Sequence, residues 1–158
     1  FTSAFVTSPK KNHIKKRIIE NLKIENDRFI NIISEDARLS SSYSHTGGRL
    51  ILDGATIQPN VELGRHIYIS NNAVLCANAK IDNFVNISNL ASIMSNVQIR
   101  EGAYIGACAS ILNNLSIGKW SIIGMGSVVI KPVNDYEIVA GNPARVIGEN
   151  IDAKRLFE

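Results

Sequence analysis

The sequence predicts a mainly β protein built as a parallel β-helix, and three observations lead to that fold class. An aliphatic residue returns at every sixth position over most of the chain, a mostly small residue follows four positions later, and glycine, asparagine or aspartate often stands between them. A helix repeats every 3.6 residues and a simple strand every two, so neither explains a strict period of six. A coil of three short strands explains it, because each group of six residues then supplies one flat side.

The aliphatic series is unbroken, and a series of its length would arise by chance on the order of 10⁻⁸. We expect these side chains to fill the interior of a prism. They are Ile51, Ile57, Leu63, Ile69, Leu75, Ile81, Ile87, Ile93, Ile99, Ile105, Ile111, Ile117, Ile123 and Val129. The residues four positions after them, such as Ala55, Ala73 and Ala91, are expected to fit where the wall bends.

Residues that accept unusual backbone angles are expected at the corners between the flat sides. They are Gly64, Asn71, Asp82, Asn83, Asn89, Gly106, Gly118 and Gly124. The six-residue frame extends backwards to Ile33 and Leu39 but fails at His45, which predicts a distorted first coil. The predicted β-helix covers residues 35–134 and, at ~4.8 Å per coil, is roughly 27 Å tall.

Residues 1–34 are predicted to be a partial α/β segment. Ser8 and Pro9 indicate the start of a helix that reaches about Ile24. Its apolar face is expected to consist of Ile14, Ile18, Ile19 and Leu22. The basic residues Lys10, Lys11, Lys15, Lys16 and Arg17 are expected to be solvated, with contact to a diphosphate as the alternative.

A strand over residues 29–33 is expected to follow this helix. Because an α/β unit needs about 30 residues and a partner strand, we expect roughly 60 further residues before Phe1. Residues 135–158 are predicted to cap the other end as loop and extended chain, with a short helix over residues 151–157.

Composition excludes several classes of protein. The 158 residues are 45% hydrophobic and 20% charged with a net charge of +3, which indicates a globular chain and is too mild to predict a nucleic-acid partner. No apolar stretch reaches the roughly eighteen residues of a membrane span. Cys76 and Cys108 form neither a CxxC motif nor a disulfide framework, so a reducing cytoplasm is the expected location.

Motifs near the C-terminus resemble those of a known family. The segments IGMGSVV at 123–129, KPV at 131–133 and IVAGNPARV at 138–146 are similar to the end of the hexapeptide-repeat acyltransferases. The segment IISEDARLS at 32–40 is similar to the sialic-acid O-acetyltransferase and bacillosamine N-acetyltransferase subfamily. The resemblance covers about residues 5–147.

The resemblance implies a left-handed β-helix that follows a domain for a nucleotide sugar. It also implies a homotrimer in which acetyl-CoA lies in a groove between neighbouring prisms. The implied function is acetyl transfer from acetyl-CoA to a sugar or a nucleotide-linked amino sugar. No metal is expected, because a zinc-dependent carbonic anhydrase on this fold needs three histidine ligands and the sequence lacks those ligand histidines.

The family's catalytic residues do not carry over to this sequence. The position of the catalytic His is Ala77, its carboxylate partner is Asn78, and the second His position is Asn86. The His at the end of the strand before the first coil is Ser34.

The three histidines and Cys76 are the candidates to replace the missing base. His13 is expected to be a solvated side chain, and His45 is expected to belong to the distorted coil. His66 falls in a different column of the repeat from Ala77, although a neighbouring subunit could present it. Cys76, beside Ala77, could be acylated, but a half-buried thiol without a neighbouring His is usually inert.

The positions implied to bind the cofactor are better preserved. Small residues and backbone amides that let the pantetheine arm lie flat, together with two basic residues, match the family at Ser95, Gly106, Ala107, Gly124, Met125, Lys131 and Arg145. Turn chemistry and packing explain the same residues equally well.

The sequence therefore predicts an acetyl-CoA-dependent sugar acyltransferase. An amine acceptor that arrives unprotonated needs a base least, so N-acylation is favoured over O-acylation. The alternative is a catalytically degenerate β-helix that binds a ligand or assembles without chemistry, and the Ala77–Asn78 pair favours it.

Overall fold

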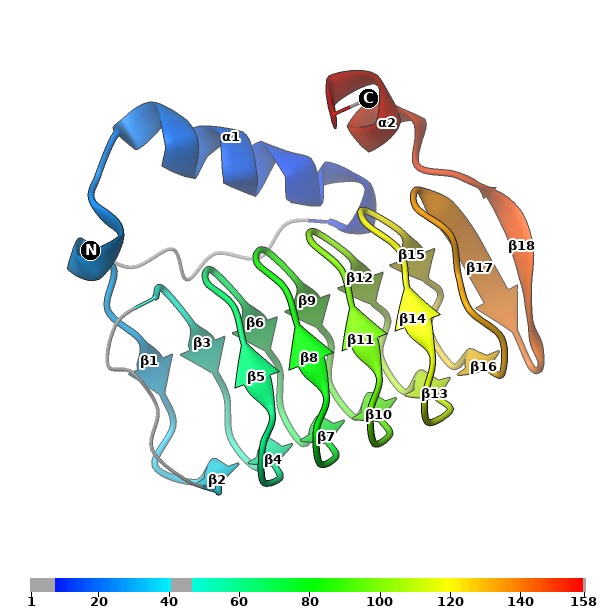
Figure 1. The fold of residues 1–158 in the computed structure, drawn as a ribbon, viewed down its shortest axis with the longest axis horizontal. Helices are drawn as coiled ribbons and strands as arrows, with labels where there is room; N and C mark the ends of the chain where they lie inside the picture. The colour runs from blue at the N-terminus through cyan, green and yellow to red at the C-terminus, as the bar shows by residue number, and fades with distance from the viewer. Residues whose placement is uncertain (1–7, 41–46, 158) are drawn as a thin grey trace.

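The computed structural model describes residues 8–40 and 47–157. The chain winds into a stack of triangular coils whose three flat sides are parallel β-sheets, so the predicted parallel β-helix is confirmed (Figure 1). Consecutive coils are related by 18 residues, since Ile69 lies beside Ile87 and Ile87 beside Ile105. Each coil therefore contains three of the six-residue units.

Each sheet collects one strand from every coil. The first sheet contains β1 (Ile32–Ile33), β3 (Leu50–Ile51), β6 (Tyr68–Ile69), β9 (Asn86–Ile87), β12 (Tyr104–Ile105), β15 (Ile122–Ile123), β17 (Glu137–Gly141) and β18 (Ala144–Glu149). The second contains β2 (Arg38–Leu39), β4 (Thr56–Ile57), β7 (Val74–Leu75), β10 (Ser92–Ile93), β13 (Ser110–Ile111) and β16 (Val128–Val129). The third contains β5 (Glu62–Leu63), β8 (Lys80–Ile81), β11 (Gln98–Ile99) and β14 (Ser116–Ile117).

The three corners are named by the sheets that they join. The first corner leads from the first sheet to the second and contains residues 34–37, 52–55, 70–73, 88–91, 106–109 and 124–127. The second corner leads to the third sheet and contains residues 58–61, 76–79, 94–97 and 112–115. The third corner returns to the first sheet and contains residues 64–67, 82–85, 100–103 and 118–121.

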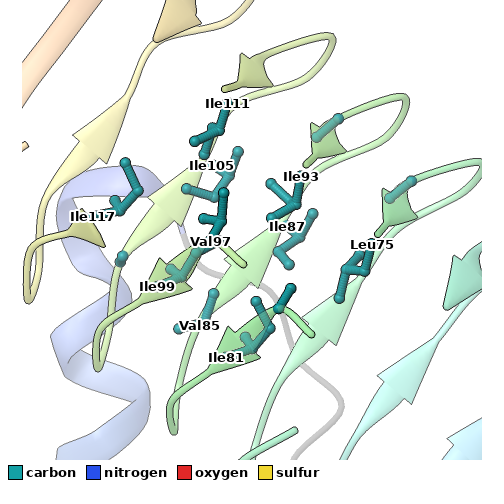
Figure 2. Packing of buried hydrophobic residues seen from close by; sticks show 14 of the residues in the cluster. Leu75, Ile81, Val85, Ile87, Ile93, Val97, Ile99, Ile105, Ile111 and Ile117 are labelled. Atoms are coloured by element: carbon teal, nitrogen blue, oxygen red, sulfur yellow. The ribbon is translucent and has the colours of Figure 1, made fainter. Parts of the chain in front are cut away.

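The predicted aliphatic series fills the interior of the prism. Ile51, Ile69, Ile87 and Ile105 have no exposed surface, and the small residues four positions later lie beside them in one continuous core. Figure 2 shows the side chains from the three sheets meeting along the axis. Ile33 and Leu39 pack against this core, and β1 pairs with β3, so the repeat begins before residue 35.

The eight residues predicted for the corners all lie in them, but the left-handed backbone falls at another position of each unit. Every sixth residue from Gly54 to Gly126 has a φ between 55° and 70°, and this position also holds bulky residues such as Phe84 and Trp120. The predicted corner glycines lie one position after the inward aliphatic residue, outside the left-handed region. They are required because the next coil lies too close for a Cβ: one added to Gly106 would lie 2.6 Å from the backbone nitrogen of Met125.

A helix covers the third corner. After a 3-10 turn, η1 (Pro9–Lys11), helix α1 (Asn12–Leu22) runs along the prism, and a second 3-10 turn, η2 (Asn26–Arg28), leads to β1 (Figure 1). Ser8 precedes the helix but makes no side-chain cap hydrogen bond.

The predicted apolar face of α1 is wrong. Ile19 is buried, but Ile14, Ile18 and Leu22 are exposed, and the helix instead buries the polar side chains of Asn12 and Lys15. The reason is that the third corner offers backbone carbonyl groups as acceptors, while its apolar cluster with Phe84 and Trp120 takes up Ile19 alone of the four predicted residues. Asn12 Nδ2 donates to the carbonyls of Phe84 and Gly102 at 2.8 and 2.9 Å, and Lys15 Nζ donates to that of His66 at 2.7 Å.

The C-terminal segment caps the stack. Strand β17 continues the first sheet beside β15, β18 returns antiparallel to it, and the predicted short helix is present as α2 (Ile151–Phe157). Phe157 stacks on Trp120 with ring centroids 4.6 Å apart, while Lys16 of α1 lies over the Phe157 ring and pairs with Glu101. The two helices therefore meet over the third corner. In the described part of the chain, neither helix has the length and apolar character needed to cross a membrane.

Gly102 combines a left-handed backbone with close packing, which makes it a test of the corner geometry. Its φ is +70°, and an added Cβ would lie 2.2 Å from the Trp120 ring. We expect Gly102→Ala to lower the free energy of unfolding by roughly 2–5 kcal/mol, from backbone strain plus overpacking. Gly126→Ala is the matched control, because Gly126 has a similar φ of +66° and open space around it. Its expected cost is roughly 1–2 kcal/mol in the same denaturation experiment. Equal losses of unfolding free energy in the two variants would contradict the steric role of the Trp120 ring.

Lys15 gives a pH-dependent test of helix docking. It is 1% exposed, and burial lowers its pKa from 10.5 to about 8. Between these values the folded chain binds fewer protons than the unfolded chain, so this contribution to stability increases as pH rises. In urea unfolding, the free energy of unfolding of the wild type should therefore rise relative to that of Lys15→Met by about 3 kcal/mol from pH 7 to pH 10.5. A pH-independent difference would show that the amine is solvated.

Candidate functional site

The position expected to hold the catalytic base lies at the second corner. Ala77 is half-buried there, and its backbone N–H donates to Oε1 of Gln58 in the preceding coil at 3.0 Å. Asn78, the expected carboxylate partner, is exposed beside it. The methyl and amide side chains at these two positions have no group that accepts a proton at neutral pH.

Asn78 belongs to a ladder of asparagines along the second corner. Asn60, Asn78, Asn96 and Asn114 follow one another at 18-residue intervals with φ between 59° and 62°. Asn60 donates to Asn78 at 3.3 Å, and Asn96 donates to Asn114 at 3.0 Å. The left-handed backbone accounts for asparagine at this position, because it accepts that conformation better than most residues.

The structure does not bring Asn86 to Ala77. Asn86 lies on the first sheet with no exposed surface, and its Nδ2 donates to Asn12 Oδ1 of α1 at 2.9 Å. Ala77 lies at the second corner, on the other side of the apolar interior. Asn86 therefore anchors the helix rather than lining a shared site with Ala77.

His66 lies at the third corner and is 3% exposed. Its ring stacks on Phe84 at 4.9 Å and meets the edge of Phe29 at 4.8 Å, between centroids. Burial, with smaller contributions from the positive charges of Lys15 and Arg65, lowers its pKa to about 4. The imidazole is therefore neutral and packed inside this chain, away from the corner that holds Ala77.

The remaining candidates are scattered. His13, predicted to be solvated, is a buried residue of α1, and burial lowers its pKa. His45 lies outside the described residues. Ser34 is half-buried, and its Oγ accepts a hydrogen bond from the N–H of Asp36 at 3.1 Å, so it caps a local turn. Cys76 is half-buried at the second corner.

Four of the residues implied to bind the cofactor gather at the first corner. Gly106 and Ala107 lie one coil before Gly124 and Met125, and the Gly126 N–H donates to the carbonyl of Ala107 at 2.8 Å. Met125 is 79% exposed, so this corner presents one long apolar side chain to solvent.

The other three lie around the second corner and the C-terminal hairpin. Ser95 and Lys131 continue the column of Ala77, one and three coils further along, as their 18-residue spacing requires. Lys131 and Arg145 line one pocket of about 210 Å³ beside the hairpin. Six of the seven residues therefore divide between two corners that flank the second sheet, and Arg145 lies on the C-terminal hairpin.

Sequence reasoning missed a polar pocket of about 510 Å³ on the third sheet. Among the residues that line it are Glu62, Lys80, Asp82 and Glu101, and Lys80 pairs with Glu62 at 2.9 Å. The outward positions of this sheet are polar in consecutive coils, which was the available signal. In the described ranges no three His, Cys, Asp or Glu side chains gather as a metal site would require.

Neither a scan against protein-family models nor a search of the curated proteins finds a match to this sequence. Solved structures do match. The acetyltransferase domain of PglB from Neisseria gonorrhoeae aligns with a TM-score of 0.78 and 25% identity over 92% of this chain and 75% of that one. Its complex with acetyl coenzyme A aligns with a TM-score of 0.77 and 26% identity over 89% of this chain and 73% of that one.

Two further matches share the fold. WeeI from Acinetobacter baumannii aligns with a TM-score of 0.75 and 24% identity over 87% of this chain and 68% of that one. A variant of perosamine N-acetyltransferase from Caulobacter crescentus, in complex with CoA and GDP-perosamine, aligns with a TM-score of 0.60 and 21% identity over 89% and 67%. The chain thus has the fold and the six-residue repeat of the hexapeptide-repeat sugar acetyltransferases, and its likeness to the PglB domain supports an acetyltransferase.

Proposed function

We propose that this chain transfers the acetyl group of acetyl-CoA to a sugar, at an amino group rather than a hydroxyl group, and that the sugar is nucleotide-linked. The observation that carries the proposal is the alignment with the PglB domain over 92% of the chain, together with that domain's complex with acetyl coenzyme A. The cysteine pattern still favours a cytoplasmic location.

In the proposed reaction the acceptor nitrogen attacks the thioester carbonyl. The new C–N bond forms, the C–S bond breaks, and the amine proton leaves with the CoA sulfur or through water. A backbone N–H at a corner would stabilise the oxyanion, and binding would place the two reactants in contact. These two effects need no side chain at position 77.

A homotrimer would unite the two groups of cofactor-binding candidates. All but Arg145 lie at the first and second corners, so packing three prisms by their second sheets would place the first corner of one subunit beside the second corner of its neighbour. That side carries exposed apolar residues, namely Leu90, Met94, Leu112, Met125 and Ile130. Such a patch is unusual on a monomer, which supports a buried interface.

A second candidate is a catalytically degenerate scaffold that binds a ligand or assembles without chemistry. Ala77 and Asn78 favour it, since positioned general-base catalysis is typically worth 10²–10⁴-fold. The intact fold and corner glycines are compatible with both candidates.

One assay with two proteins separates these candidates. Free-thiol release from acetyl-CoA is measured with a panel of amino sugars and nucleotide sugars, for the wild type and for Ala77→His with Asn78→Glu. We expect measurable wild-type turnover with an amine acceptor and a roughly 10²-fold or larger gain in the double variant.

Turnover by neither protein, with acetyl-CoA binding retained, would support the scaffold and overturn the enzyme. If His66→Ala or Cys76→Ala abolishes turnover and the variant still unfolds like the wild type, the reaction would depend on the side chain that was removed.

The trimer is tested by light scattering at micromolar concentration. We expect three times the mass of the chain, and Leu112→Asp should shift the mass toward the monomer because it places a charge in the apolar side. Leu22→Asp, on the exposed face of α1, is the matched control and should leave the mass unchanged. A wild-type monomer would remove both the interface and the shared groove.

A further inference from the structure

A pocket of about 720 Å³ lies at the β14 end of the third sheet. It is lined by Arg100, which follows β11, by Lys119, which follows β14, and by Lys154 of α2. The fold thus brings three basic residues from separate elements to one concavity. None of the seven residues implied to bind the cofactor lines this pocket.

One wall of this pocket is the segment between β16 and β17. Gly118 allows this segment to approach, because a Cβ added there would lie 2.3 Å from the carbonyl carbon of Asn134. The Asp135 Oδ1 accepts the backbone N–H of Lys119 at 2.7 Å, which holds the segment against the third corner. The shape of the pocket therefore depends on backbone packing between neighbouring coils.

The charges that line this pocket do not cancel. Within residues 8–40 and 47–157, the side chains of Arg100 and Lys119 have neither an ion pair nor a hydrogen bond. Lys154 lies 3.4 Å from Glu149, and such an exposed pair contributes little. The lining contains one carboxylate, Asp135, so it carries an excess of about two positive charges.

The pocket of about 510 Å³ toward the other end of the same sheet has the opposite charge. Its lining contains three carboxylates and one ammonium group, namely Glu62, Asp82, Glu101 and Lys80. An anion is therefore repelled from the β5 end of the third sheet and attracted to the β14 end.

A diphosphate matches the basic pocket. The guanidinium of Arg100 can donate two parallel hydrogen bonds to phosphate oxygens, and the two lysines can act as point charges. A diphosphate that joins two groups carries two negative charges, which equals the excess in the lining. The volume lies within the range of roughly 300–1,000 Å³ that is usual for sites of small ligands, and exposed Pro132 offers apolar surface to a nucleoside.

We propose that this pocket binds the diphosphate group of a nucleotide, either free or joined to a sugar, through Arg100, Lys119 and Lys154. The inference goes beyond the proposed function, because it involves neither position 77 nor the two corners that flank the second sheet.

Calorimetric titration of UDP into the wild-type chain tests this inference. We expect binding that weakens as the NaCl concentration rises, because salt screens exposed charges. UMP, which lacks one phosphate, should bind about tenfold more weakly. Absence of UDP binding at millimolar concentration, or equal binding of UMP, would overturn the inference.

Titration of UDP-glucosamine distinguishes the two sources of the diphosphate. Tighter binding than UDP would support a nucleotide-linked sugar as the ligand, and weaker binding would support the free nucleotide.

Arg100→Gln should weaken UDP binding about tenfold or more, because it removes a charge-assisted hydrogen bond to phosphate. The control is Arg65→Gln, which removes the same charge. Arg65 is exposed in the column of Lys119, three coils before it, and lines a different pocket. The control should bind UDP like the wild type, and equal weakening in both variants would contradict a specific site.

Asp135→Asn should have the opposite effect on the same binding constant. It keeps the oxygen that accepts the Lys119 N–H but removes the one carboxylate of the lining, so UDP should bind roughly threefold or more tightly. A variant that fails to fold cannot produce this gain. Weaker UDP binding by Asp135→Asn, in a variant with the wild-type urea midpoint, would argue against the inference.

CoA also contains a diphosphate, so its binding is measured with Arg100→Gln as well. Unchanged CoA binding would support a separate nucleotide site, whereas equal weakening of CoA and UDP would assign the pocket to the cofactor and overturn the inference. None of these titrations depends on thiol release, so UDP binding without acetyl transfer would reject the enzyme and keep the inference.

Discussion

The hydrogen bonding of each coil to the coil 18 residues further along is the constraint on which the rest of the structure depends. A two-residue strand has almost no stability alone, but each one pairs on both sides inside the stack, as where Tyr68 N–H donates to Val85 and Asn86 N–H to Ala103, both at 3.0 Å. The same register places identical or similar aliphatic side chains above one another, so hydrogen bonding and apolar burial require the same spacing.

Turning every six residues places one residue of each unit in the left-handed region, whatever its side chain. For a residue with a Cβ this costs roughly 1–2 kcal/mol, whereas full burial of a large apolar side chain contributes about 1.5–3 kcal/mol. At the third corner, Phe84 and Trp120 are both left-handed and nearly fully buried beneath the two helices. Burial therefore offsets the strain there, while asparagine or glycine is common at the exposed corners.

This balance explains what the sequence could predict. The inward series was visible because apolar burial repeats with the backbone. The turning residue was not visible, because tertiary contacts make Phe84 and Trp120 acceptable in a backbone conformation that favours glycine or asparagine. The orientation of α1 was missed for a related reason, since an amphipathic pattern assumes an apolar partner, whereas the corner offered carbonyl groups to Asn12 and Lys15.

The candidate site depends on the same rigidity. The position of Ala77 came from the family resemblance and its corner from the repeat, but the separation of Asn86 and His66 from it required the folded coils. These residues are fixed on other sides of a filled interior, and moving either one to Ala77 would break the 18-residue register. Rearrangement of the described coils therefore cannot replace a base at position 77. Any proton acceptor there has to come from the substrate, from solvent, from a second copy of the chain or from its remaining residues.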